Sequence, residues 1–158
     1  MRARRLMIVI LAVVVAGVAA VAGVRWLTAG EPVLVAAPDG ASEQLPEGRY
    51  ETVVDLRTSE VHHDLRTDRG PATVNTYLLP PSAAWDQIRS GVAGQLPDWE
   101  QTGDCLDTGE KRIRCRWTES AFWSPRRVEV VFLRPPTNPE DRAGWPDNTF
   151  LVIGSGRG

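Results

Sequence analysis

The two cysteines are the residues whose type and spacing point most directly to a defined chemistry. Cys105 and Cys115 are separated by nine residues, and the stretch 107–110 between them reads Asp-Thr-Gly-Glu, which favours a turn. Redox dithiols usually have a C-x-x-C spacing, and a zinc site would need two further ligands close by. The spacing therefore predicts a structural disulfide across a hairpin, which requires an oxidising compartment.

The two histidines are the next candidates, because an imidazole binds metals and transfers protons near neutral pH. His62 and His63 are adjacent and are followed by Asp64. If this segment is a strand, the two side chains point to opposite faces and cannot easily hold one ion. We therefore predict no metal site. A small envelope hydrolase that uses either histidine with carboxylates stays open as an alternative.

Other catalytic signatures are missing from the sequence. None of the seven serines lies in a G-x-S-x-G motif, which marks many serine hydrolases. The glycine-rich stretch 154–158 has no helix after it that would hold a phosphate, and we interpret it as a disordered tail. We therefore predict no catalytic residue and no cofactor, and we expect that the protein is not an enzyme.

A row of arginines is the strongest candidate for a binding surface. Basic and apolar residues alternate in 112–118, so Arg112, Arg114 and Arg116 share one face of the expected strand, and Lys111 precedes them at the turn. The remaining candidates for this surface are two further arginines and two aromatic residues that lie close by in the sequence, namely Arg126, Arg127, Phe122 and Trp123.

This candidate surface has two interpretations. A basic patch on an otherwise acidic domain would bind an anionic envelope component, such as a phosphate-bearing wall polymer or a lipid headgroup, or an acidic protein partner. Alternatively, Glu129 and Glu119 neutralise the arginines on a solvated sheet face. Phe122 and Trp123 lie in the loop between the two strands and have their own alternatives, which are a contact site or packing back over the core.

One clear helix and several strands are expected to position these residues. Apolar side chains recur in 82–96 at spacings of three and four, at Trp85, Ile88, Val92 and Leu96. Ser82 is placed to cap this principal helix. Residues typical of strands occupy 72–79, 112–118, 128–133 and 150–153, with weaker candidates at 51–56 and 61–65.

The order of these elements predicts the fold class. A second, short helix is expected to begin at Asn138-Pro139. The sequence therefore predicts an α+β domain with a mainly antiparallel sheet and helices on one of its faces. A ferredoxin-like, split βαβ topology is our first choice.

The N-terminal segment determines where this domain is expected to lie. The uncharged apolar residues 6–24 begin with Leu6 and end with Val24, and as a helix they would be roughly 28 Å long. Arginines at positions 2, 4 and 5 are expected to keep residues 1–5 in the cytoplasm. We predict an uncleaved signal anchor over 6–24, and a signal-peptidase site at Ala20-Val21-Ala22 is the less favoured alternative.

Two further predictions concern the anchor and the segment after it. Ala12, Ala16 and Ala20 are spaced by four, which would allow helix pairing in the membrane, although such a composition is also common without pairing. Residues 25–48 are rich in Pro, Gly and Ala and are interpreted as a tether, with the alternative that 33–37 packs as a short edge strand. The extracytoplasmic domain then covers 49–158.

The distribution of charge narrows the function. All 20 acidic residues follow residue 25 but four of the 18 basic residues do not, so the part after residue 25 has a net charge of −6. Nucleic-acid binding is therefore not expected. We expect a single-pass protein of a bacterial cell membrane with its C-terminal domain outside, rather than a protein secreted after cleavage.

Our leading hypothesis is a non-catalytic binding or interaction module of the cell envelope. The alternatives are the small hydrolase described above and a structural or assembly subunit of a membrane complex. That subunit would act partly through its transmembrane helix.

Overall fold

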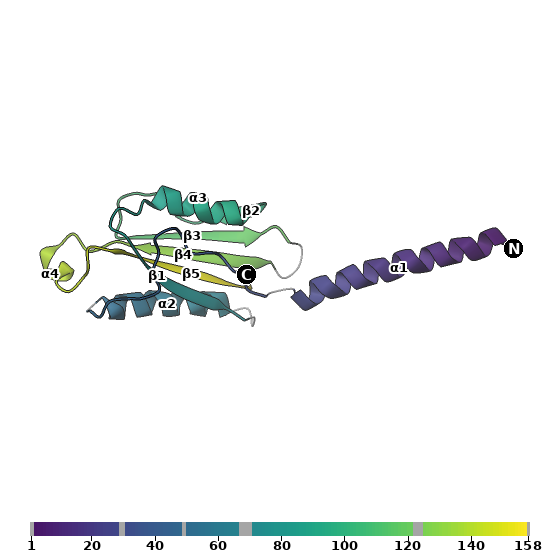
Figure 1. Cartoon of the computed structure of the whole chain (residues 1–158), viewed down its shortest axis with the longest axis horizontal. Coiled ribbons are helices and arrows are strands. Elements are labelled where there is room, and N and C mark those ends of the chain that lie inside the picture. The colour runs from purple at the N-terminus through teal and green to yellow at the C-terminus, as the bar shows by residue number, and fades with distance from the viewer. Residues whose placement is uncertain (1, 29–30, 49, 67–70, 122–124, 158) are drawn as a thin grey trace.

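A five-stranded antiparallel sheet forms the centre of the structure, with helices against both of its faces (Figure 1). The computed structural model describes residues 2–28, 31–48, 50–66, 71–121 and 125–157, and in the N-terminal helix it describes the side chains of residues 10–24. The elements are α1 (Arg2–Thr28), α2 (Glu51–Arg66), β1 (Thr73–Leu79), α3 (Trp85–Gln95), β2 (Trp99–Thr102), β3 (Arg112–Glu119), β4 (Arg126–Leu133), α4 (Pro139–Arg142) and β5 (Thr149–Arg157).

The strand order confirms the predicted class and corrects the predicted topology. The order is β1-β5-β4-β3-β2, and every neighbouring pair is antiparallel. In a ferredoxin-like fold one strand separates the two parallel strands of each split βαβ unit, whereas three strands separate β1 from β2 here, so the ferredoxin-like topology is wrong. Instead, α3 carries the chain from β1 at one edge to β2 at the other edge. The chain then returns strand by strand to β5, which pairs with β1.

Helix α3 covers one face of the sheet, as its apolar spacing predicts. Trp85, Ile88 and Val92 are buried against the apolar side chains of β3, β4 and β5. The expected alternation on β3 is confirmed, since Ile113, Cys115 and Trp117 are all buried. The predicted cap is wrong, because the helix begins at Trp85 and its N-cap residue Ala84 makes no side-chain cap hydrogen bond.

Helix α2 covers the opposite face, where the sequence suggested two weak strands. Val54, Val61 and Leu65 are buried, and their spacings of seven and four place them on one side of a helix. Thr58 lies on the same side, and its hydroxyl donates to the carbonyl of Val54 at 2.9 Å and contacts the hydroxyl of Thr76 on β1 at 3.0 Å. The prediction of helices on one face only is therefore wrong.

Strand β5 continues through the stretch that we interpreted as a disordered tail. Gly154, Ser155 and Gly156 are buried within it. The glycines are required by the packing of α2, because a Cβ on Gly154 would lie 2.6 Å from Cδ1 of Leu65. The absence of a side chain thus lets α2 approach the sheet closely, and the tail prediction is wrong.

The segment expected to be a tether packs against the domain from residue 33 onward. Val35 is buried in the core on the α3 side, and the backbone N–H of Val33 donates to Oγ of Ser155 at 2.7 Å. Further along, Ser42 forms an isolated antiparallel bridge with Leu78 at the β1 edge. Residues 33–42 therefore extend the domain, which is closer to the alternative of edge packing than to a free tether.

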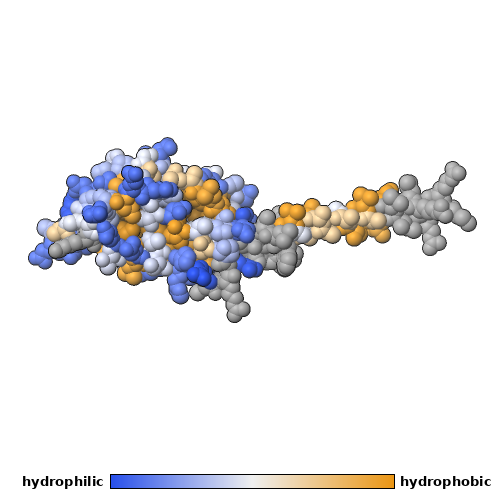
Figure 2. All heavy atoms as spheres, turned by 60° about the horizontal axis from the view of Figure 1, so that its bottom comes forward, coloured by the Kyte–Doolittle hydropathy of each residue, from blue (hydrophilic) through white to orange (hydrophobic). Residues whose placement is uncertain are grey.

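Helix α1 projects from the domain (Figure 1). Its apolar side chains between Ile10 and Val24 are exposed along the helix (Figure 2). Among the residues that the structure describes, no helix combines the length and the apolar character needed to cross a bilayer. The transmembrane helix predicted over 6–24 is therefore not supported by the structure.

Candidate anion-binding cleft

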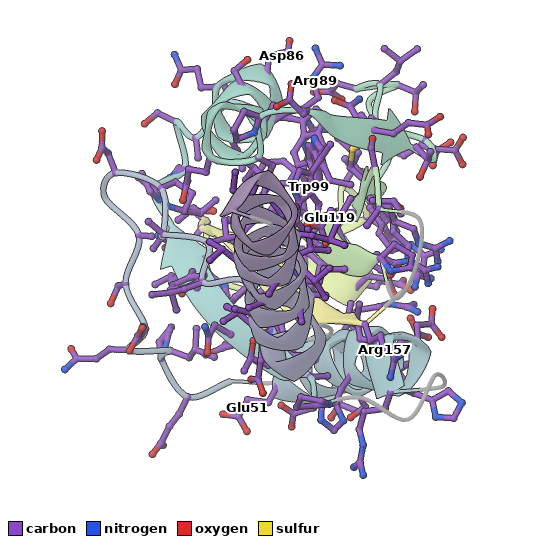
Figure 3. All side chains as sticks on the ribbon, turned by 90° about the vertical axis from the view of Figure 1, so that its right-hand side faces the viewer. Glu51, Asp86, Arg89, Trp99, Glu119 and Arg157 are labelled. Carbon is purple, nitrogen blue, oxygen red and sulfur yellow. A yellow bond between two sulfur atoms is a disulfide. The ribbon has the colours of Figure 1, made fainter. Side chains whose placement is uncertain are left out.

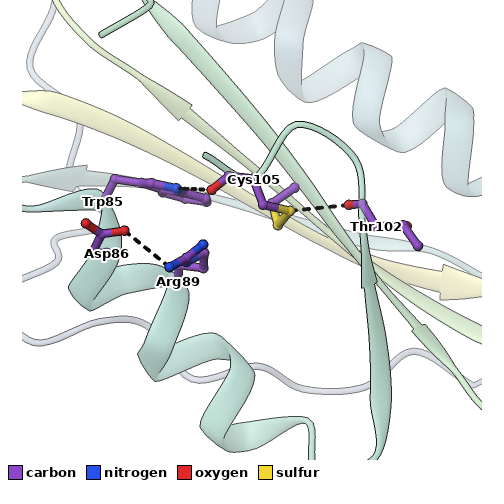
Figure 4. The surroundings of a disulfide bond; sticks show 6 residues. Trp85, Asp86, Arg89, Thr102 and Cys105 are labelled. Atoms are coloured by element: carbon purple, nitrogen blue, oxygen red, sulfur yellow. Dashed lines mark hydrogen bonds and ion pairs between the residues drawn. A yellow bond between two sulfur atoms is a disulfide. The ribbon is translucent and has the colours of Figure 1, made fainter. Parts of the chain in front are cut away.

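The cysteines form the predicted disulfide. Cys105 and Cys115 are bonded, both are buried, and their Cα atoms lie 4.8 Å apart (Figure 4). The indole N–H of Trp85 on α3 donates to the carbonyl oxygen of Cys105 at 2.8 Å. The disulfide thus ties the connection between β2 and β3 to β3, and the hydrogen bond from Trp85 ties it to α3.

The histidines lie on α2 rather than on a strand. His62 is half-buried and His63 is exposed, and neighbouring residues on a helix point in directions about 100° apart. Within the described part of the chain, no three metal-binding side chains come together. Neither histidine lines the two cavities described below. The hydrolase alternative therefore gains no support from their positions.

Two of the three arginines on β3 are neutralised by carboxylates. Nε of Arg114 donates to Oε1 of Glu129, and its Nη2 donates to Oδ2 of Asp64 on α2. Nε of Arg116 donates to Oε2 of Glu129 at 3.2 Å, and Glu129 is fully buried. Burial opposes the charge of Arg114, but its hydrogen bonds to Glu129 and Asp64 outweigh this effect and raise its pKa.

The other members of the candidate surface are divided by the sheet. Strand register places Arg127 on the α2 side and Arg126 on the α3 side. Arg126 donates to both carboxylate oxygens of Glu119, at 2.8 and 2.7 Å, and these hydrogen bonds raise its pKa. Its guanidinium lies 5.6 Å from the ring centre of Trp99, which Figure 3 shows beside Glu119. Phe122 and Trp123 lie outside the described residues.

A cleft of about 350 Å³ lies at the end of the sheet where β3 begins and β4 ends. We call it the basic cleft. Its lining combines cationic side chains with apolar ones and consists of Val53, Arg57, Lys111, Arg112, Leu133, Arg134, Pro136, Asp141 and Trp145.

The register of β3 and β4 brings the cationic side of the basic cleft together. Arg112 pairs with Leu133, and the backbone N–H of Arg134 donates to the carbonyl oxygen of Lys111 at 2.9 Å. Arg57 reaches the cleft from α2. On the apolar side, Trp145 packs edge-on against the ring of Phe150, with the ring centres 5.7 Å apart.

The pairing of charges in the basic cleft is incomplete. Nη1 of Arg57 donates to both oxygens of Glu60, at 2.6 and 2.7 Å. Arg134 donates to both oxygens of Asp107, and these bonds raise the pKa of Arg134 and, with the N–H of Gly109, lower that of Asp107 to about 2. Three carboxylates, those of Glu60, Asp107 and Asp141, thus face four cationic groups.

Lys111 and Arg112 are the two cationic groups that remain available. Nζ of Lys111 lies 3.7 Å from Asp141, and Nη1 of Arg112 lies 3.8 Å from Glu60, which is beyond hydrogen-bond distance in both cases. Their side chains are also the most exposed of the four, at 57% and 44%. These two groups can therefore donate hydrogen bonds to an anion that enters the cleft.

A second cavity of about 380 Å³ lies between α3 and residues 36–39. Its described lining combines small and polar side chains with the apolar side chains of Leu79, Ile88 and Val92, and Asp39 is the one titratable residue among them. Gln95 lies at this cavity and holds the backbone of Ala36, since its Oε1 accepts from the Ala36 N–H at 2.7 Å. The described residues that line this cavity include no cationic, thiol or imidazole group, so we do not assign a site to it.

Sequence reasoning identified Lys111 and Arg112 but missed Arg57, Arg134 and Trp145. Pairing 112–118 with 127–133 as a hairpin would have placed Arg134 beside Lys111. Nothing in the sequence indicated that Arg57 would join them, because it lies between the two weak strand candidates at 51–56 and 61–65 and no helix was expected there. No family model, curated protein or solved structure was found to match this chain.

Proposed function

We propose that this protein is a non-catalytic binding module of the bacterial cell envelope and that the basic cleft binds an anionic ligand. One observation carries the proposal. Lys111 and Arg112 face a cavity of about 350 Å³ without a hydrogen bond to a carboxylate in the described part of the chain. Cavities that join an apolar lining to a few convergent polar groups are the usual form of ligand sites.

The location outside the cytoplasm is part of the same proposal. The disulfide between Cys105 and Cys115 favours an oxidising compartment. The exposed apolar side chains of residues 10–24, together with arginines at positions 2, 4 and 5, favour attachment of α1 to a membrane with the N-terminus on the cytoplasmic side. The domain that carries the basic cleft would then lie on the outer side.

Equilibrium dialysis of the full-length protein in nonionic detergent micelles against citrate, a small carboxylate anion, tests this proposal. Replacing Lys111 and Arg112 by Ala removes the two available donors, and we expect citrate binding about tenfold weaker. The matched control replaces Arg66 and Arg89 by Ala, which removes two charges outside the basic cleft, and we expect a change below twofold.

Two outcomes would overturn the proposal. One is equal citrate binding by the wild type and by the Lys111→Ala, Arg112→Ala variant. The other is an equal loss in the control variant, which would show that net charge alone attracts the anion. Far-UV circular dichroism of all three proteins shows whether each variant keeps the fold.

A further inference from the structure

We infer that the basic cleft recognises a single terminal carboxylate joined to a small apolar group, on a molecule that approaches from the side of the domain opposite α1. This inference rests on the proposed function and specifies its ligand. Four features of the structure lead to it: where the positive charge is available, what lines the cleft, how its arginines bind carboxylates, and where the cleft lies.

Within the row of arginines along β3, the positive charge that remains available lies at the end nearest Lys111. Arginines 112, 114 and 116 form a row along β3, and alternate residues of a strand are spaced by roughly 6.6 Å, which would suit a polyanion. However, Glu129 and Asp64 already bind Arg114 and Arg116. An extended polyanion would therefore meet available donors only at the Lys111 end of the row, which suits one anionic group.

The apolar lining of the basic cleft indicates that the ligand carries an apolar group beside its anionic group. Val53, Leu133 and Trp145 line the basic cleft beside the cationic groups. Trp145 is held by its ring contact with Phe150 and by Tyr50, whose ring centre lies 6.1 Å away. An apolar group on the ligand would cover these side chains and gain ~25 cal/mol per Å² of apolar surface removed from water. The volume of about 350 Å³ limits that group to a small one.

The arginines of the cleft already bind a carboxylate of this chain. Both carboxylate oxygens of Glu60 accept a hydrogen bond from Nη1 of Arg57, whereas Nη1 of Arg112 lies 3.8 Å from the same carboxylate. The guanidinium of Arg112 therefore keeps its planar set of donors for a second carboxylate, which it fits in a bidentate manner. The ammonium of Lys111 adds a charge without this geometric requirement.

The position of the basic cleft determines the side from which the ligand arrives. The chain enters the domain from α1 near Ser155, to which the N–H of Val33 donates. The cleft lies at the other end of the sheet, where Leu133 pairs with Phe150. Ser155 and Phe150 are five residues apart on β5, which corresponds to roughly 17 Å along the strand. Figure 1 shows α4, which borders the cleft, and α1 at opposite ends of the molecule. Headgroups of a membrane that holds α1 are thus not the ligand.

The test compares soluble probes with the full-length protein in nonionic micelles. N-acetylleucine carries both parts of the inferred ligand, acetate carries only the carboxylate, and N-acetylleucine methyl ester carries only the apolar part. We expect N-acetylleucine to bind about tenfold more tightly than either of the others. We expect the Lys111→Ala, Arg112→Ala variant to lose this preference and the Arg66→Ala, Arg89→Ala control to keep it.

Two further probes separate failure of this inference from failure of the proposed function. These probes are poly-L-glutamate with an amidated C-terminus and glycerol 3-phosphate, a soluble lipid headgroup. If either binds the basic cleft more tightly than N-acetylleucine, or if N-acetylleucine binds no better than acetate, the inference is wrong while the proposed function stands. If no anion distinguishes the wild type from the cleft variant, both are wrong.

Discussion

Glu129 on β4 is fully buried and accepts a hydrogen bond from Nε of Arg114 on the neighbouring strand. The two partners differ in their access to water, because the side chain of Arg114 is 27% exposed and that of Glu129 is not exposed at all. Asp64 joins this pair to α2. The free energy of unfolding should therefore depend unequally on the two sides of this ion pair.

Removing the arginines should cost more than removing the acid. Replacement of Arg114 and Arg116 by Met leaves Glu129 buried without its cationic partners, and we expect a loss of about 3–5 kcal/mol in the free energy of unfolding. Glu129→Gln keeps the shape and leaves arginines that still reach water, so we expect a loss of about 1–2 kcal/mol. Urea unfolding at pH 7 measures both. Equal losses, or the reverse order, would show that the buried carboxylate does not depend on this pairing.

Three glycines should respond differently to the addition of one methyl group. Gly154→Ala places a Cβ against Val61 and Leu65 of α2, and we expect a loss of about 1–3 kcal/mol. Gly156→Ala is less crowded, with Leu65 Cβ at 3.1 Å, and should lose less. Gly91→Ala on α3 meets no atom within 4 Å and should gain about 1 kcal/mol. Thermal unfolding of the three variants tests this order of stability. A Gly154→Ala protein as stable as the wild type would contradict the close packing of α2 on the sheet.

Tyr50→Phe should stabilise the protein. The hydroxyl of Tyr50 is buried and has no hydrogen-bond partner among the described residues, while its ring stacks on Phe150 at 4.5 Å. The variant keeps the stacking and removes the unpaired hydroxyl, so we expect a gain of about 1 kcal/mol at pH 7. A less stable variant would indicate that the hydroxyl does find a partner.

The same residue should contribute to alkaline unfolding. Burial, together with the charges of Glu51 and Glu47, raises the pKa of Tyr50 above its ordinary value of 10.0. The unfolded chain therefore loses this proton first, and the associated stability is present below pH 10 and is lost as the pH rises beyond it. Urea unfolding at pH 7 and at pH 10.5 should show a smaller alkaline loss for Tyr50→Phe than for the wild type. An equal loss in both proteins would contradict this account.

Acid should weaken the contact between Asp107 and Arg134. The hydrogen bonds from Arg134 and from the N–H of Gly109 lower the pKa of Asp107 from 3.8 to about 2. The unfolded chain binds this proton first as the pH falls, so the stability that the pair adds is complete above about pH 4 and is lost toward pH 2. Asp107→Asn should therefore lose less stability than the wild type between pH 4 and pH 2 in thermal unfolding. Parallel losses would exclude a contribution from this pair.

The sequence predicted those elements in which apolar residues recur at the regular spacing of a helix or of a strand. The spacing of Trp85, Ile88 and Val92 predicted α3, and the alternation along β3 predicted which of its side chains are buried. Helix α2 was missed because its β-branched residues, such as Val53 and Val54, resemble a strand, and its few buried positions are far apart. Its helical state depends on packing against the sheet.

Other features depend on contacts that no local pattern records. The glycines at 154 and 156 have low strand propensity, yet they lie in β5 because α2 requires space above them. For the basic cleft, Lys111 and Arg112 were found from their charge, whereas Arg57 and Trp145 reach it from distant segments. Asp64 and Glu129 determine which arginines of the row are already paired. The sequence did not show these pairs, because they depend on how α2, β3 and β4 pack together.

Nitrogen NMR of the arginine side chains measures most directly whether the basic cleft holds a carboxylate. The Nε–H signal of Arg112, assigned by its loss in Arg112→Lys, is followed in full-length protein in micelles as N-acetylleucine is added. Our account predicts a saturable shift of the Arg112 signal and no shift of the signal of Arg89, which lies on α3 outside the cleft. An unchanged Arg112 signal at concentrations at which N-acetylleucine is bound would contradict it.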